Sequence, residues 1–273
     1  MAFNKIWLMA AASLAALGAC STAPDASGAK PHAMGKAATG SVLDAGITAA
    51  GGEAALSKVK ELYWTGHATV TAAGKTSEVD VRDVVRPFTY ARFGSWPTDK
   101  SPIQAITIQV EQNKAWEVRG SNWGPMPEDK AKNENDQMAL FSMMLLAPLK
   151  ASDAMVKEQP AAGGTRAIQA TYMNHSAELE FNASNKLVKV GGMVANPDGG
   201  ADITQVATLT GEVESNGVKW PKHIAITRNG APWMDIDIAT FEALPEPVIR
   251  PMEQTMQNAP PPKGDIPVIT DAG

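Results

Sequence analysis

The stretch that decides the fold reads LYWTGHATVTA, residues 62–72. Its even-numbered positions hold Leu, Trp, Gly, Ala, Val and Ala, whereas its odd-numbered positions hold Tyr, Thr, His, Thr and Thr. Successive side chains of a strand point to opposite faces, so this alternation predicts a strand with one apolar and one polar face. Gly74 and Lys75 then predict a turn, and residues 78–86 repeat the alternation. The two segments therefore predict an antiparallel hairpin.

The same period of two returns along most of the chain. Asn216-Gly217 and Asn229-Gly230 each separate two such segments, and Asn-Gly is a strong hairpin signal because both residues accept a positive φ. Asn113-Lys114 predicts a further turn. The additional alternating segments are 106–110, 116–118, 168–172, 179–181, 187–190, 203–213, 218–226 and 234–238. We therefore predict about ten antiparallel strands, in a sheet so wide that it must curl, close or be covered.

Two segments have a helical pattern instead. Residues 41–58 place apolar side chains at helical spacing, and Gly51 and Gly52 predict either one bent helix or two short ones. Residues 128–149 lack alternation, begin with acidic residues and end near Pro148, which favours a helix. The second half of this helix is apolar nearly all round, so we expect it to be buried on more than one side.

These patterns predict a mainly β protein of the α+β class. We expect a curled antiparallel sheet that forms an incomplete barrel, with helices covering its concave face. Residues 41–244 carry the pattern and are the predicted folded domain. Residues 20–40 are dominated by small residues and predict a flexible tether, and the proline density of residues 245–273 predicts an extended tail.

Two tryptophans fall outside the alternating segments. Trp96 and Trp123 lie beside glycine or proline, so we expect both in loops. There they either pin their own loops to the sheet or contact a membrane surface or a partner.

Composition excludes several classes of partner. The 273-residue chain carries 24 basic and 29 acidic side chains without a basic run, so we expect no nucleic-acid partner. Beyond residue 19, the longest apolar stretch is residues 138–147, which is short of the ~20 residues that cross a membrane. The chain has one cysteine, Cys20, and therefore no pair of thiols for a disulfide.

The N-terminus has the order of an export signal. Lys5 precedes an apolar core, and Leu17-Gly18-Ala19 leads directly to Cys20. This order resembles bacterial lipoprotein signal peptides, which implies that residues 1–19 are removed and that Cys20 is lipidated and anchors the chain. Ser21, where aspartate would favour retention, then favours the outer membrane, facing the periplasm. The alternative is an ordinary secretory signal with a chance cysteine.

Several segments of the body follow one another in a familiar order. They are Gly51-Gly52, Ala55-Leu56, Val59-Lys60, Leu62, Gly66, the Met- and Leu-rich helix ending at Pro148, Asn216-Gly217-Val218-Lys219-Trp220-Pro221, and Asn229-Gly230. In this order residues 45–243 resemble LolA-like periplasmic carriers and the related lipid-binding lipoproteins. The resemblance implies a half-barrel whose helices enclose an apolar cavity for acyl chains. The anchor at Cys20 departs from the soluble carriers and favours a fixed acceptor or a lipid-binding lipoprotein.

The candidate ligand cavity lies between the first strand and the Met-rich helix. Methionine is flexible and polarizable, which suits a surface that accepts ligands of varied shape. The residues predicted to line the cavity are Trp64, Ala68, Val70, Met138, Phe141, Met144 and Leu145. The alternative is that the same side chains fill a packed core.

The sequence carries no motif for catalysis or metal binding. Its histidines, His32, His67, His175 and His223, are scattered and form no HExxH pattern, so we predict no metal site. Acidic pairs such as Asp235 and Asp237 lie two apart, which is typical of a solvated sheet face. No GxSxG elbow is present. We therefore predict no cofactor and no enzyme activity.

Two functions remain open at this point. The first is a membrane-anchored periplasmic lipoprotein that binds acyl chains of a lipid or a lipoprotein between sheet and helices, in envelope lipid or lipoprotein handling. The second is a scaffold or interaction lipoprotein of the envelope with a filled core, which uses its sheet surface and Pro-rich tail for contacts. A continuous apolar cavity favours the first function, and dense packing favours the second.

Overall fold

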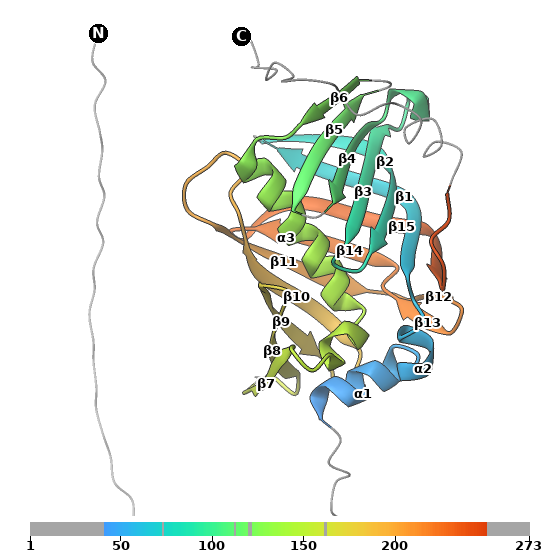
Figure 1. Ribbon diagram of the computed structural model, residues 1–273, viewed down its shortest axis with the longest axis vertical. Coiled ribbons are helices and arrows are strands. Elements are labelled where there is room, and N and C mark those ends of the chain that lie inside the picture. Colours follow the sequence, from blue (N-terminus) through green and yellow to red (C-terminus); the bar gives the residue numbers. More distant parts are fainter. Residues whose placement is uncertain (1–40, 73, 112, 120–121, 161–162, 250–273) are drawn as a thin grey trace, which may run out of the picture. The chain divides into compact units, whose positions relative to one another are not determined.

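The computed structural model describes residues 41–249, except 73, 112, 120–121 and 161–162 (Figure 1). The predicted signal peptide, Cys20, the tether and most of the Pro-rich tail lie outside the described residues. Strands dominate the described part, and thirteen of them form one antiparallel sheet. No helix in this part of the chain is long and apolar enough to cross a membrane.

The elements follow one another in a simple order. The helices are α1 (Val42–Ala49), α2 (Glu53–Leu56) and α3 (Glu128–Met144), with 3-10 turns η1 (Pro102–Gln104) and η2 (Ala147–Lys150). The first strands are β1 (Glu61–Ala72), β2 (Lys75–Arg86), β3 (Tyr90–Pro97), β4 (Ile106–Glu111), β5 (Lys114–Arg119) and β6 (Asn122–Pro125). After α3 come β7 (Met155–Gln159), β8 (Arg166–Tyr172), β9 (His175–Phe181), β10 (Leu187–Val194), β11 (Ile203–Thr210), β12 (Val213–Ser215), β13 (Val218–Trp220), β14 (His223–Arg228) and β15 (Ala231–Leu244).

The large sheet joins two meanders. Its strand order is β6-β5-β4-β3-β2-β1-β15-β14-β11-β10-β9-β8-β7, so the edge strands are β6 and β7 and the sheet is not closed into a barrel. Strands β12 and β13 form a separate two-stranded ribbon. Figure 1 shows the sheet curling around α3, which contacts β2, β4 and β5 of one meander and β9 and β10 of the other. This confirms the prediction of a mainly β fold with a curled, incomplete barrel.

Strand β1 has the two faces that its alternation predicts. Leu62 and Trp64 are fully buried and Ala68 is 4% exposed, whereas His67 on the opposite face is exposed. The buried face contributes to one hydrophobic core with the apolar side chains of α3. We call the face of the sheet that α3 covers the concave face, and the opposite face the outer face.

The N-terminal segment forms two short helices, one of the two predicted outcomes. Ser41 caps α1 by accepting a hydrogen bond from Asp44 N at 3.1 Å. Gly51 and Gly52 end the helix with φ values of 124° and 90°, which only glycine adopts readily. A Cβ at Gly51 would lie 1.9 Å from the carbonyl oxygen of Gly217, so this turn packs directly on the β12–β13 hairpin.

Helix α3 is shorter than the predicted helix over residues 128–149. Glu128 and Asp129 stand in its first turn, as the positive end of a helix dipole favours. It ends at Met144, because Leu146 has a left-handed φ of 61° that breaks the helical path before η2. Leu146 is nevertheless buried, and its burial against the core offsets the cost of that conformation.

The sequence underestimates the number of strands. Strands β3, β6 and β7 have no clean alternation and were not expected, and Trp96 and Trp123 lie in β3 and β6 rather than in loops. Two predicted strands, 203–213 and 218–226, are each divided in two. Gly211, with a φ of 64°, separates β11 from β12, and Pro221 separates β13 from β14. The turns at Asn113, Asn216 and Asn229 occur as predicted, each with a positive φ at the asparagine.

The close approach of strands β1 and β15 at Gly66 can be tested by substitution. This residue sits beside the register shift between β1 and β15, and a Cβ there would lie 2.1 Å from the carbonyl oxygen of Asp237. Backbone cannot move aside as a side chain can, so we expect Gly66→Ala to lower the free energy of unfolding by about 1–3 kcal/mol in urea titrations. Gly124→Ala in β6 is the matched control, because a Cβ there meets nothing within 4 Å. Equal stability of both variants would contradict the close approach.

Candidate functional site

The apolar half of α3 packs against the concave face. Met138, Met143 and Met144 are between 0% and 5% exposed. Ser142 fixes this half to the end of the β2–β3 hairpin, because its Oγ accepts a hydrogen bond from Phe88 N at 2.9 Å and donates one to Met138 O at 2.7 Å. The ring of Phe88 in turn meets Tyr172 edge-on at 5.0 Å. The Ser142 hydroxyl therefore ties α3 to Phe88 of the first meander, and the Phe88 ring contacts Tyr172 of the second.

The structure brings together most of the side chains predicted to line a cavity. The rings of Trp64 and Phe141 are in contact, with centroids 5.4 Å apart. Phe93 and Trp220 extend this contact across the core, at 5.9 Å from Phe141 and 6.2 Å from Trp64. Ala68, Met138, Met144 and Leu145 belong to the same buried cluster, whereas Val70 is half-buried and lies outside that cluster. Their role as cavity walls stays a prediction.

The hollow nearest to these residues is small. It has a volume of about 60 Å³ and is lined in part by Met144, Leu146 and Trp220. A drug-sized ligand needs ~300 Å³ or more, so this hollow admits such a ligand only if α3 moves.

The polar half of α3 is organised around Asp136. This carboxylate accepts hydrogen bonds from Ala195 N at 2.8 Å and Lys132 Nζ at 3.0 Å, and it lies 3.2 Å from His175 Nδ1. Burial acts to raise the pKa of Asp136, but the bonds from His175, Ala195 and Lys132 outweigh burial and hold the pKa below its ordinary value. The bond to Asp136 also raises the pKa of Lys132. Asp136 thus connects α3 to the start of β9 and the end of β10.

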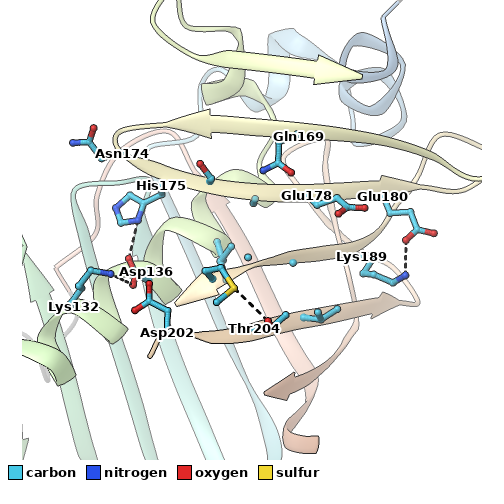
Figure 2. Close-up of a pocket in the computed structure, with 17 residues that line it drawn as sticks. Lys132, Asp136, Gln169, Asn174, His175, Glu178, Glu180, Lys189, Asp202 and Thr204 are labelled. Carbon is cyan, nitrogen blue, oxygen red and sulfur yellow. Dashed lines mark hydrogen bonds and ion pairs between the residues drawn. The ribbon is translucent and has the colours of Figure 1, made fainter. Parts of the chain in front are cut away.

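Two larger hollows flank this half of the helix. The first, of about 520 Å³, lies where the sheet opens: β9 and β10 pair only as far as Gly191↔Glu178, and their remaining residues pair with other strands. Figure 2 shows Lys132, Asp136 and His175 at one end of this hollow and Glu180 with Lys189 at the other. Its apolar lining comes from Leu140, Ala177, Met193 and Val206.

The second hollow, of about 570 Å³, lies on the other side of the same residues. It is bounded by Trp116 and Met126 near β5 and β6 and by Met173 in the β8–β9 turn. Lys132, Asp136, Asn174 and His175 line both hollows and form the boundary between them. Each hollow therefore combines charged and apolar lining.

A second cluster of polar side chains joins α3 to β14. Arg228 of β14 donates a hydrogen bond from Nη2 to Asn133 Oδ1 at 3.2 Å, and its guanidinium lies 3.5 Å from the ring centre of Trp233. Gln137 Nε2 donates to Asn133 Oδ1 at 2.9 Å and to Glu134 Oε2 at 3.1 Å. Burial raises the pKa of Glu134 to about 7 and lowers that of Arg228 to about 10. These bonds fix the polar half of α3 over β14.

The concave face also carries one carboxyl group among its apolar side chains. Asp83 of β2 is the cross-strand neighbour of Trp64 and is 6% exposed. Burial raises the pKa of Asp83 to about 8, although the hydrogen bond from Gly94 N, 3.2 Å long, acts to lower it. The carboxyl group is therefore largely protonated at neutral pH.

Sequence reasoning missed the polar part of this site. Lys132 and Asp136 stand at i and i+4, a spacing that favours an ion pair on a helix, and this signal was available. No sequence signal connects either residue to His175, which reaches them from a different strand. Sequence reasoning gave Asp83 no role, although it stands between Val81 and Val85 at an otherwise apolar position, and it lies on the buried face.

The chain was compared with protein-family models, curated protein sequences and solved structures. No protein-family model matches the chain, and no curated protein sequence matches it. A LolA superfamily protein from Nitrosomonas europaea is similar in structure, with a TM-score of 0.45 at 11% identity over 71% of this chain and 94% of that one.

Two further solved structures have comparable values. A domain from Vibrio parahaemolyticus, named for outer membrane lipoprotein sorting, has a TM-score of 0.45 at 10% identity over 73% of this chain and 92% of its own. A DUF1329 family protein from Desulfovibrio piger has a TM-score of 0.48 at 8% identity over 74% of this chain and 91% of its own.

The raised pKa of Asp83 gives a test of the buried carboxyl. An unfolded aspartate has a pKa of about 3.9. Between that value and about 8, the folded chain binds one proton more than the unfolded chain, so this group makes stability fall as pH rises. Asp83→Asn does not titrate and keeps an oxygen for Gly94 N. We expect wild type to lose stability relative to Asp83→Asn across this range in urea titrations. Asp153→Asn, a change at an exposed site that keeps Asp83, should lose stability in parallel with wild type.

Proposed function

We propose that the chain is a membrane-anchored lipoprotein of the cell envelope, without enzyme activity, that binds acyl chains of a lipid or an acylated protein between its sheet and α3. The anchor is Cys20, and the compartment is the periplasmic face of the outer membrane. The ligand site is the apolar half of α3 with the concave face beneath it. Trp64, Ala68, Val70, Met138, Phe141, Met144 and Leu145 are its proposed walls.

One observation carries this proposal: an unclosed sheet is covered by a single Met-rich helix whose other half is flanked by two large hollows. The hollows measure about 520 and 570 Å³, within the ~300–1,000 Å³ of small-molecule sites. Both hollows begin at the polar half of α3 and reach apolar side chains, Leu140 in one and Met126 in the other. An amphiphile can therefore place its polar group beside Lys132 and Asp136 while its acyl chain contacts the apolar side chains of the hollow.

Binding on the apolar half requires that α3 moves. An acyl chain replaces the contacts of methionine and leucine side chains with similar apolar contacts, at ~0.8 kcal/mol for each methylene buried. Replacing side-chain contacts with acyl-chain contacts therefore changes the free energy little once the helix is released. The hydrogen bond from Phe88 N to Ser142 Oγ ties the apolar half to the β2–β3 turn and opposes its release, and the polar half can stay anchored through Asp136.

A second candidate function is favoured by the packing of the core. Trp64 is fully buried, its ring contacts Phe141 and Trp220, and Met143 is fully buried beside them. A core filled in this way fits a scaffold lipoprotein that contacts envelope partners through its surface. The two functions differ in whether the protein carries a stoichiometric lipid.

The first test is direct detection of bound lipid. We expect the chain with Cys20→Ser, exported in its native host and purified without detergent, to carry about one acyl-chain ligand per protein in native mass spectrometry and organic extracts. Met144→Asp with Leu145→Asp should abolish binding while circular dichroism still shows the strands, because charges on this surface exclude an apolar chain. The milder Met144→Ala with Leu145→Ala introduces no buried charge and should weaken binding, and circular dichroism checks that this variant is also folded.

Met155→Asp is the control for the added charge, because Met155 of β7 is 67% exposed and lines none of the three hollows. A protein without lipid that also takes up no fluorescent fatty acid would favour the scaffold function. Retained lipid in the folded double-aspartate variant would place the ligand elsewhere.

Ser142→Ala tests whether the helix acts as a movable cover. The change leaves Phe88 N without its partner and should lower the free energy of unfolding by about 1–3 kcal/mol. We expect the weaker attachment to raise the rate of fluorescent fatty-acid uptake several-fold in stopped-flow measurements. Thr48→Ala is the control, because Thr48 makes the same bond to a carbonyl one turn back, at 2.9 Å, but joins α1 to no other element. Unchanged uptake by Ser142→Ala would mean that α3 does not gate the site.

A further inference from the structure

The outer face of the sheet carries a row of alternating aspartates and histidines. Asp80 of β2 pairs with His67 of β1, His67 pairs with Asp237 of β15, and Asp237 pairs with His223 of β14. These four residues stand side by side on four adjacent strands, at one level of the sheet. Asp235 lies on the same face of β15, two residues from Asp237. The row is on the side of the sheet opposite α3 and the hollows.

The side chains of the row already contact one another in pairs. His67 Nδ1 lies 2.5 Å from Asp80 Oδ1. His223 lies between two carboxylates, with Nδ1 3.0 Å from Asp237 Oδ1 and Nε2 3.2 Å from Asp235 Oδ1. The side chains of His67 and Asp237 are 72% and 70% exposed, so solvent reaches both. Each imidazole thus has a carboxylate beside it, and the row is open to solvent.

With neutral histidines, the row and its neighbours carry a net negative charge. The row contributes the carboxylates of Asp80 and Asp237, Asp235 lies beside it, and Glu78 lies two residues from Asp80 on β2. The nearby cations are Arg82, which packs over the Trp96 ring at 5.5 Å, and Lys222, which donates to Ile238 O at 3.3 Å. Cations are therefore attracted to this part of the face.

We propose that this row binds one Zn²⁺ ion, with His67, Asp237 and His223 as ligands. Neutral imidazole and carboxylate are ligands that zinc takes at about 2.0–2.2 Å. Adjacent strands are about 4.8 Å apart, so β1 and β14 are about 10 Å apart with β15 between them. Two imidazoles that lean toward each other from this separation can meet one ion above Asp237. Asp235 or water completes the coordination.

Asp80 is a positioning residue in this proposal. It holds His67 through Nδ1, which leaves Nε2 for the metal, and a carboxylate behind a ligating histidine is the usual arrangement at zinc sites. Within the described residues, no three or more His, Cys, Asp or Glu side chains already converge on one point. Coordination therefore requires rotation of Asp237 and His223 out of their present pairs, which the exposure of Asp237 permits, whereas His67 keeps its contact with Asp80.

No pattern in the sequence pointed to this site. The prediction of no metal site rested on the wide spacing of the histidines along the chain. The register of β1, β15 and β14 brings His67 and His223 two strands apart with a carboxylate between them. A bound ion would connect the two meanders at the strands where they join, and should therefore stabilise the folded chain.

The test is titration with Zn²⁺ alone. The full chain is used with Cys20→Ser in every variant, so that no thiol competes for the metal. We expect calorimetry to show one equivalent of zinc bound, with a matching rise in the thermal midpoint. His67→Gln and His223→Gln should each weaken the affinity by at least about tenfold, and Asp80→Asn should weaken it by about tenfold through the orientation of His67.

His175→Gln is the matched control. His175 also has a carboxylate partner, Asp136 at 3.2 Å, but it lies outside the row, so this variant should bind zinc as the parent does. The proposal is overturned if the parent binds no zinc, if His67→Gln with His223→Gln binds it with unchanged affinity, or if His175→Gln weakens binding as much as the row variants. The altered row side chains are exposed or half-exposed, and circular dichroism checks that each variant is folded.

Discussion

The concave face of an unclosed sheet must be covered, and most of this structure depends on how that is done. Thirteen strands curl without closing, so their apolar side chains need another element to pack against. Helix α3 supplies that surface, with Phe141 against Trp64 at its centre. It also contacts both meanders, so it links the two halves of the sheet. The helix is thus both the cover of the sheet and the brace that keeps it curled.

The two halves of α3 perform different tasks. Its second half is apolar and completes the core, whereas its first half buries Asn133, Asp136 and Gln137 in polar contacts. Buried polar groups of this kind are costly unless they are paired, and here they bond to Ala195, Arg228 and one another. Such directional bonds fix the position of the helix more narrowly than apolar contact does. An anchored polar half next to a replaceable apolar half is a reasonable construction for a cover that opens at one end.

Parts of the fold were predictable from the sequence where a physical requirement leaves a local pattern of residues, and not where it depends on distant segments. Strand β1 and the Asn-Gly hairpins were predictable because one apolar face and a positive φ leave local traces in the sequence. Strand β3 was missed because both of its faces are partly buried, with Ala91 on one and Arg92 on the other, so it does not alternate. The meeting of His175 with Asp136, like that of His67 with His223, depends on which strands become neighbours. That order arises from the whole sheet, and no short segment encodes it.

The pairing of β1 with β15 has a consequence for the order of folding. The register runs from Glu61↔Leu244 to Val70↔Met234, so one edge of the first strand is completed by the last. A chain that emerges N-terminus first can form the β1–β2 hairpin early, but that edge of β1 has no partner until almost all of the described chain is available. Contacts so distant in sequence slow folding and leave a strand edge open to wrong pairing in the meantime. We therefore expect the pairing of β1 with β15 to form last, and the open edge of β1 to be the part of the sheet most exposed to wrong pairing during folding.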